Sequence, residues 1–208
     1  MGSQERRERE KTARKNQILR AARALLLKNG LHATTVNQIA ELAELSVGTI
    51  YLYYHNKEDI FATLQVEGLE LLNRQITLAA GTAVSPGEKI RAIAHAYLDF
   101  SRKQRNYYDI ITYFLSTPGQ VFPQRLKSRI DSTGGRILQV CTGAIKSGIK
   151  AGVFRKVNAE RHAIWLWGTL HGLIQFRKME KTILNKEAHQ SLVEYALDNY
   201  LKTLVIKQ

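Results

Sequence analysis

Residues 34–57 read TTVNQIAELAELSVGTIYLYYHNK, and this stretch decides the fold of the N-terminal part of the chain. A threonine at 34 or 35 is a good N-cap for a short helix whose inner face carries Val36, Ile39 and Ala40. A turn at residues 44–46 follows, and Ser46 caps a second short helix, expected over residues 47–54. Two short helices joined by a tight turn indicate a helix-turn-helix, whose second helix enters the DNA major groove.

The second helix of this motif carries side chains suited to DNA contact. Gly48 and Thr49 lie on its opening turn, where small side chains allow the backbone to approach DNA closely. Thr35 and Ser46 stand at helix starts, where hydroxyls and backbone N–H groups bind phosphate. Further along, Tyr51 and Tyr53 offer rigid rings with hydroxyl groups, and Lys57 adds a cation. We therefore predict DNA contacts from Thr35, Ser46, Gly48, Thr49, Tyr51, Tyr53 and Lys57.

Each of these residues also has a structural interpretation. The two threonines could serve as caps alone, and Tyr51 and Tyr53 could be ordinary surface tyrosines. His55 is as compatible with solvent as with phosphate. Tyr54 follows Ile50 by four residues, so we expect it in the core.

The composition is that of a globular protein of 208 residues, enough for one or two domains. No apolar run approaches the ~20 residues of a membrane helix, and we expect a cytoplasmic protein without a membrane partner. The single cysteine, Cys141, excludes an internal disulfide and fits a reducing compartment.

The formal net charge of +13 favours a polyanionic partner. Residues 1–56 hold nine Lys or Arg and five acidic residues, a net charge of +4, which leaves +9 for the rest. The excess outside the motif is explained either by a solvated basic surface that attracts DNA non-specifically or by a basic C-terminal region that receives an acidic ligand.

The whole chain has a helical pattern, and we predict an all-α fold. Only three prolines occur, and no period-two pattern persists. Residues 5–15 form a solvated lead-in to a first helix that Asn29-Gly30 should stop. Breaks near residues 81–87 separate two regions, which the long helix before the breaks should connect. Because this connecting helix begins at about residue 57, we predict a DNA-binding domain at 1–56 and a helical ligand-binding and dimerisation domain at 57–208. Helices are expected at about 57–80, 87–104, 107–116, 123–150, 158–178 and 187–206, and Gly134-Gly135 is a possible interruption of the fourth of these.

The run TTVNQIAELAELSVGTIYLYYHNKEDIF resembles the N-terminal DNA-binding region of the TetR family of transcriptional regulators. The resemblance covers about residues 15–62 and rests on Thr35, Ile39-Ala40, Gly48-Thr49-Ile50-Tyr51, Tyr53-Tyr54 and Lys57-Glu58. It implies an all-helical homodimeric repressor that releases operator DNA when a small molecule enters the C-terminal region. It also implies that Asn37 lies near base edges. Leu52 and Val47 depart from the pattern, so the operator sequence should be this protein's own.

For the dimer, the best candidates are the two last helices, because a two-fold axis through a helix pair builds a four-helix bundle. Gly168 and Gly172 lie one turn apart and suit close helix contact, although they could equally pack inside one subunit. The predicted dimer interface consists of Trp165, Gly168, Thr169, Gly172, Leu192, Tyr195, Ala196 and Tyr200.

For a ligand, the C-terminal region offers many aromatic side chains, which at helical spacing are more often core than pocket. As a set, some should line an apolar cavity, and the candidates are Tyr97, Phe100, Tyr108, Phe114, Phe122, Trp165 and Phe176. The cations Arg102, Lys103 and Arg105 suit either an acidic head group or a solvated helix end.

The histidines have no metal-ligand spacing, and no catalytic signature is present, so we expect no metal, no cofactor and no enzyme activity. A ligand-responsive repressor is the leading hypothesis, in which the ligand moves the 57–80 helix and changes the separation of two motifs. The alternatives are an architectural protein that binds any duplex and an all-helical enzyme with an incidental basic end.

Overall fold

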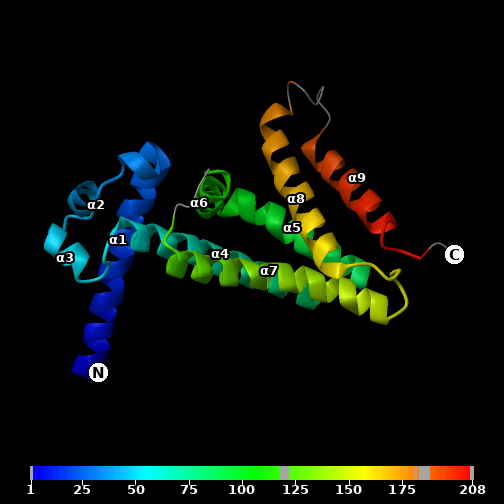
Figure 1. Ribbon diagram of the computed structural model, residues 1–208, viewed down its shortest axis with the longest axis horizontal. Helices are drawn as coiled ribbons and strands as arrows, with labels where there is room; N and C mark the ends of the chain where they lie inside the picture. The colour runs from blue at the N-terminus through cyan, green and yellow to red at the C-terminus, as the bar shows by residue number, and fades with distance from the viewer. Residues whose placement is uncertain (1, 118–121, 181, 183–187, 207–208) are drawn as a thin grey trace. The chain divides into compact units, whose positions relative to one another are not determined.

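The computed structural model describes residues 2–117, 122–180, 182 and 188–206, and across these ranges the fold consists of nine α-helices and one 3-10 turn (Figure 1). The all-α prediction is therefore confirmed. No helix of the described ranges is long and apolar enough to cross a membrane.

Packing divides the chain into two compact units: unit 1 is Met1–Leu69 with Arg105–Asp131, and unit 2 is Glu70–Gln104 with Ser132–Gln208. Two long helices, α4 (Lys57–Thr82) and α7 (Gln124–Lys150), contribute one part to each unit. The predicted domain boundary lies directly after the DNA-binding motif, at residue 56. The division by packing instead places the first part of α4 and residues 105–131 in the same unit as the motif.

Unit 1 contains α1 (Ser3–Ala33), α2 (Val36–Leu42), α3 (Val47–Tyr51) and α6 (Arg105–Ser116) together with the first part of α4. Figure 1 shows α2 and α3 on the same side of α1. Apolar side chains from four of these helices are fully buried, namely Ile18, Ile39, Ile50 and Phe61. These side chains form the small core that fixes α3 on its support.

The first helix bends where the sequence predicts its end. Gly30 has φ 79 and ψ 176, a conformation that glycine adopts easily and other residues do not. Three more residues continue in helical form to Ala33. The lead-in predicted at residues 5–15 is helical as well, because α1 begins at Ser3, and its side chains are exposed.

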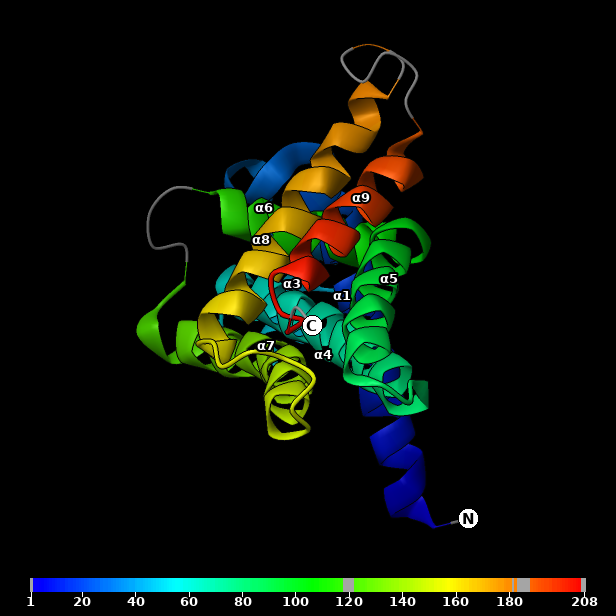
Figure 2. The same cartoon turned by 90° about the vertical axis from the view of Figure 1, so that its right-hand side faces the viewer.

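Unit 2 contains α5 (Pro86–Lys103), α8 (Ala159–Phe176), the 3-10 turn η1 (Arg177–Met179) and α9 (His189–Lys202), together with parts of α4 and α7. Ser85 starts α5 with a capping box, since its side chain accepts from Glu88 N and the Glu88 carboxylate accepts from Ser85 N. Figures 1 and 2 both show α8 and α9 side by side. The core of this unit includes Ile90, Phe100, Ile145, Leu166 and Leu197.

Most predicted helix boundaries agree with the structure to within a few residues. The exception is α3, which ends at Tyr51 rather than 54 because Leu52 and Tyr53 form a turn that leads into α4. The α7 helix passes through Gly134-Gly135 without interruption, and it ends at Lys150, before Gly152 with φ 69. The start of the last predicted helix, residue 187, lies outside the described residues.

Candidate nucleic-acid interface

The start of α2 is built by two neighbouring threonines with different environments. Thr35 is the N-cap: its hydroxyl accepts from Gln38 N (3.2 Å), and the Gln38 side chain accepts from Thr35 N (2.9 Å). Thr34 is buried, and its hydroxyl donates to Gly30 O (2.7 Å). Only Thr35 therefore keeps its side chain exposed at the helix end, where phosphate could approach the N–H groups.

The start of α3 is fixed by a pair of hydroxyls. Ser46 Oγ accepts from Thr49 N at 3.0 Å and lies 2.8 Å from Thr49 Oγ1. The preceding turn is tight, since Glu44 has a positive φ of 52 and Leu45 N donates to Ala40 O at 2.9 Å. These bonds hold the first turn of α3, with Gly48 exposed on it, in one orientation.

The outer face of α3 and the turn after it expose aromatic and apolar side chains. Tyr51 is 52% exposed and Leu52 is 81% exposed, while Tyr53 is half-buried. On α2, Asn37 is exposed. All eight predicted DNA-contact residues thus belong to unit 1 and have some exposed surface, and their contact with DNA stays a prediction.

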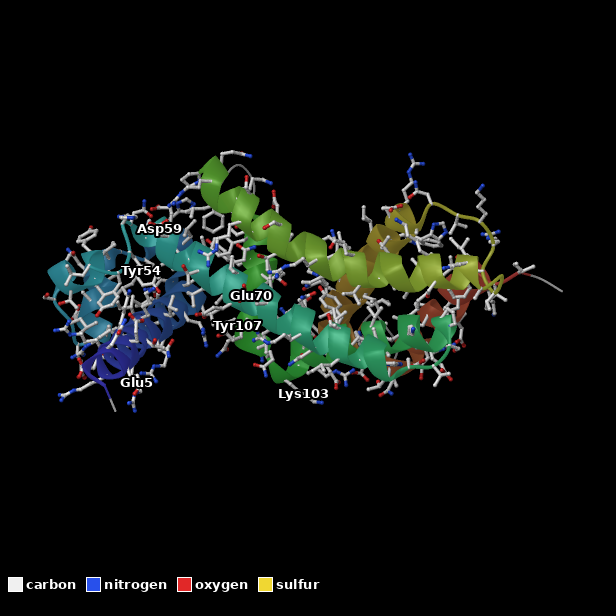
Figure 3. All side chains as sticks on the ribbon, turned by 90° about the horizontal axis from the view of Figure 1, so that it is seen from below. Glu5, Tyr54, Asp59, Glu70, Lys103 and Tyr107 are labelled. Atoms are coloured by element: carbon white, nitrogen blue, oxygen red, sulfur yellow. The ribbon has the colours of Figure 1, made fainter. Side chains whose placement is uncertain are left out.

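Tyr54 is in the core, as expected from its spacing to Ile50. It is 7% exposed, and burial is the main cause that raises the pKa of its hydroxyl to about 12. Figure 3 labels this side chain together with Asp59 in the first turn of α4. The Asp59 carboxylate accepts a hydrogen bond from His55 N, just before the helix, at 3.3 Å.

Lys57 has a structural task that the sequence did not reveal. Its ammonium donates to Leu31 O and to Thr34 O, both at 3.3 Å. These carbonyls belong to the end of α1 and the link to α2, so the lysine ties α4 to this junction. The bonds offset the unfavourable position of a cation at the start of α4.

A second helix of unit 1, α6, also bonds this junction. Tyr113 of α6 accepts a hydrogen bond from Leu31 N (3.0 Å), a donor that the bend at Gly30 leaves without an intrahelical partner. Also on α6, Tyr107 accepts from Arg23 of α1 at 2.7 Å (Figure 3). Sequence reasoning missed both tyrosines, because no local pattern distinguishes them from core aromatics.

Burial also raises the pKa of Tyr107, and its hydroxyl donates to Glu67 of α4 at 3.4 Å. Gly68 allows this arrangement, since a Cβ there would lie 3.1 Å from the Tyr107 ring. The α6 helix therefore contacts both α1 and α4 directly behind the DNA-binding motif.

The predicted pocket residues fall into both units. Tyr108, Phe114 and Phe122 belong to unit 1, where Phe114 and Phe122 have ring centroids 4.7 Å apart, and all three are buried. The other four belong to unit 2, where Tyr97 and Phe100 are buried while Trp165 and Phe176 are 48% and 43% exposed. Their role in ligand binding stays a prediction.

Unit 2 contains a polar cluster among its buried aromatics. The Tyr97 hydroxyl lies 3.0 Å from His171 Nδ1 and accepts from Trp167 Nε1 at 3.3 Å. Burial lowers the pKa of His171. Cys141 is buried too, and burial raises the pKa of its thiol to about 12, so the thiol stays protonated and unreactive near neutral pH. No group of three or more His, Cys, Asp or Glu in the described ranges is placed to hold a metal ion.

Seven of the eight predicted dimer residues on α8 and α9 keep some exposed surface, and Tyr200 is the exception. Trp165 is 48% exposed and Tyr195 is 68% exposed, whereas Tyr200 is only 3% exposed. Tyr200 packs on Trp165 with ring centroids 5.2 Å apart and donates to His162 O at 2.9 Å. In this chain Tyr200 supports the α8 face, and any contact with a second chain stays a prediction.

Comparison with known proteins places both parts of the chain. A family model described as "Bacterial regulatory proteins, tetR family" matches residues 18–64, and one described as "Tetracyclin repressor-like, C-terminal domain" matches residues 90–200. An uncharacterised HTH-type transcriptional regulator, YhgD of Bacillus subtilis, is 25% identical over 87% of this chain and 93% of its own length. The fatty acid metabolism regulator protein of the same organism is 26% identical over 67% of this chain and 70% of its own length.

Solved structures have the same fold. The regulator FadR from Bacillus subtilis, solved in complex with stearoyl-CoA, superposes with a TM-score of 0.75. It is 22% identical, and the match covers 90% of this chain and 97% of that one. At this identity the match concerns the fold.

Proposed function

This chain belongs to the TetR family of bacterial regulatory proteins, and from that premise we propose that it is a repressor that binds operator DNA as a homodimer and is released by a small hydrophobic molecule. Transcriptional regulation follows from the family. Repression, the two-fold assembly, the action in the cytoplasm and the class of effector are the proposal.

The observation that carries the proposal is the presented face of α3. Ser46 and Thr49 fix its first turn through hydrogen bonds of 3.0 and 2.8 Å, and Tyr51 stands 52% exposed on the next turn. The outer side of this five-residue helix serves no packing purpose, because Ile50 is its buried residue and packs on the inner side. It suits the major groove, where hydroxyls and rigid rings reach base edges and thymine methyls.

A homodimer is supported by the exposed face of α8. Positions 165, 168, 172 and 176 recur at helical spacing and combine two exposed aromatic rings with two glycines. Tyr195 of α9 is also exposed. An apolar face of this kind on a folded chain marks an interaction surface, and a two-fold axis lets one face cover its own copy.

For the effector, we propose a long-chain acyl group carried on an acidic head group, such as a fatty acyl-CoA. The support is the relative named as a fatty acid metabolism regulator and the neighbour solved with stearoyl-CoA. The chain's own chemistry agrees, because the buried aromatics of unit 2 suit an acyl tail and the net charge of +13 suits an acidic head group.

The proposed release acts through helices that hold the motif. Lys57 of α4 and Tyr113 of α6 both bond the Leu31–Thr34 junction, so a displacement of either helix moves α2 and α3. A small change in the spacing of two motifs is enough, because they must fit major grooves about 34 Å apart.

The test is DNA binding by the full chain with added effectors. A duplex selected by the protein from a random-sequence pool is titrated with and without stearoyl-CoA, with free CoA and stearate as controls. We expect specific binding that stearoyl-CoA weakens at least tenfold and free CoA leaves unchanged. Equal affinity for unrelated duplexes would instead support an architectural protein. Specific binding that no acyl compound changes would overturn the proposed effector while leaving the DNA-binding part in place.

A further inference from the structure

The first turns of α1 carry a row of cations that continues the buried face of the helix. Inside unit 1, Ile18 and Ala22 are fully buried. Arg7, Lys11, Arg14 and Lys15 precede them at spacings of three and four residues, so on a helix all of these positions share one face. We call Arg7, Lys11, Arg14 and Lys15 the α1 stripe.

The acidic residues of this segment do not neutralise the stripe. Glu10 is held by Arg6 at 3.0 Å, to one side of the face, and by helical spacing Glu5 lies on the opposite side of α1. Glu8 borders the face. Within the described chain, Arg7, Lys11 and Lys15 form no ion pair, and Arg14 donates to the neutral Gln17 side chain at 3.0 Å. The stripe is therefore positively charged on balance, since Glu8 at its border is one acid against four cations and none of the four forms an ion pair in the described chain.

This surface is also uncovered. Residues 4–16 are exposed throughout, and Figures 1 and 2 show the first turns of α1 continuing beyond α2 and α3. Along residues 4–16 the side of α1 that would face the core carries cations instead of apolar side chains. Packing therefore does not explain why the helix extends this far.

The position of the stripe connects it to the start of α3. Gln17, at the point where α1 enters the domain, donates through Nε2 to Ala43 O at 2.6 Å, in the turn that precedes Ser46. From Gln17 to Arg7 the helix rises about 15 Å, which is comparable to the ~12 Å width of the major groove. A duplex lying against the first turn of α3 would thus continue past the stripe.

We propose that the α1 stripe is a second DNA contact, which binds backbone phosphates beside the groove that α3 enters. The proposal rests on the proposed DNA-binding function and extends it. Lysine and arginine on an exposed face contact phosphates rather than bases, so the stripe supplies affinity that does not depend on sequence. It also makes binding more sensitive to salt, because each neutralised phosphate releases counterions.

The test compares two variants of the full chain with equal loss of charge. One carries Arg7→Gln, Lys11→Gln, Arg14→Gln and Lys15→Gln, because glutamine keeps the helix propensity. The control carries Lys150→Gln, Arg155→Gln, Lys156→Gln and Arg161→Gln, four exposed cations of unit 2 without ion pairs in the described chain. The affinity of the parent chain and of both variants is measured for a duplex that the parent chain selects, at several salt concentrations. The duplex is used in a long form and in a form trimmed to the selected base pairs.

We expect the stripe variant to lower the slope of log K against log salt by about 3 to 4 per bound chain, since each phosphate contributes about 0.9. Its ratio of specific to unrelated duplex should stay within threefold of the parent, and trimming should remove most of its difference from the parent. The control should change the slope by less than 1.

A parental slope in the stripe variant would overturn the inference and leave the proposed function intact, as would a changed base preference. If the parent chain selects no duplex at all, the proposed function fails and this contact fails with it. Equal melting temperatures of all three proteins exclude unfolding as the cause of any difference.

Discussion

The outer faces of α3 and α8 both expose side chains that a folded chain usually covers, but the chemistry of the two faces differs. On α3, Tyr51 is exposed at the last position, and the hydroxyls of Ser46 and Thr49 lie at the N-terminal turn. On α8, Trp165 stands beside Ile164, which is 54% exposed, and two glycines. The first face suits a hydrated, charged and polar partner, and the second suits an apolar surface of the same kind.

The two faces are built by different kinds of contact. The α3 face is held by short-range caps, so its geometry is local and can be read from a short stretch of sequence. The α8 face depends on the packing of α8 against α9, including the bond from Tyr200 to His162 O. Variants that disturb one face without the other separate these two roles.

The largest effect is expected from a charge placed in the α8 face. Trp165→Glu should weaken self-association more than 100-fold, because the aromatic anchor that the proposed dimer would bury is lost and a carboxylate is left desolvated in each of two symmetric positions. Analytical ultracentrifugation measures the change. Tyr195→Glu, at a 68% exposed side chain, should act in the same direction without disturbing the fold.

The matched control for these variants is Val84→Glu, at a residue that is 90% exposed outside the α8 and α9 helices. It should leave self-association unchanged. A dimer that tolerates both Trp165→Glu and Tyr195→Glu would show that the chain associates through another surface.

The next largest effect is expected on the α3 face. Tyr51→Ala should weaken binding to a selected duplex about 10- to 100-fold, the cost of one good base or phosphate contact, while self-association stays at the parental value. Fluorescence anisotropy measures both duplex affinity and specificity. Tyr51→Phe separates the ring from the hydroxyl, since loss of affinity in this variant identifies a hydrogen bond. Parental affinity in Tyr51→Ala would remove the residue from the interface.

Lys57 distinguishes a DNA contact from a structural support. Its ammonium bonds two carbonyls of the α1–α2 junction, so Lys57→Ala should lower the free energy of unfolding by about 1 to 3 kcal/mol in the absence of DNA. Denaturant titration of the free protein measures the loss. An unchanged free energy together with weaker DNA binding would assign the lysine to phosphate instead.

The smallest effect is expected at Tyr200, inside the support of the α8 face. Tyr200→Phe removes the hydrogen bond to His162 O and keeps the ring, so it should lower the free energy of unfolding by about 1 kcal/mol and leave self-association within threefold of the parent. Thermal melting measures the loss of stability, and ultracentrifugation of the same samples measures self-association. A large change in self-association would return Tyr200 to the dimer interface predicted from the sequence.

Local sequence signals predicted the α-helical fold and the motif well, for a physical reason. Caps such as Thr35 and Ser46 act over three residues, and Gly30 changes the backbone at its own position, so both can be read without knowledge of the fold. The core position of Tyr54 follows from its spacing to Ile50 in the same way.

The parts that sequence did not reveal depend on contacts between distant residues. The bonds of Lys57 and Tyr113 to the Leu31–Thr34 junction require α4 and α6 to lie beside α1, and no local pattern encodes this. The early end of α3 arises from the turn that leads to α4. The predicted pocket residues share only their aromatic character, which core packing also selects, and they divide between the two units.

The most direct test of the central claim is a footprint of the full chain on a selected duplex, compared with that of Tyr51→Ala. We expect two protected half-sites whose centres lie about 10 to 10.5 base pairs apart, or a multiple of this, and their loss in the variant. Uniform protection without preferred sites, or the same footprint in parent and variant, would contradict it.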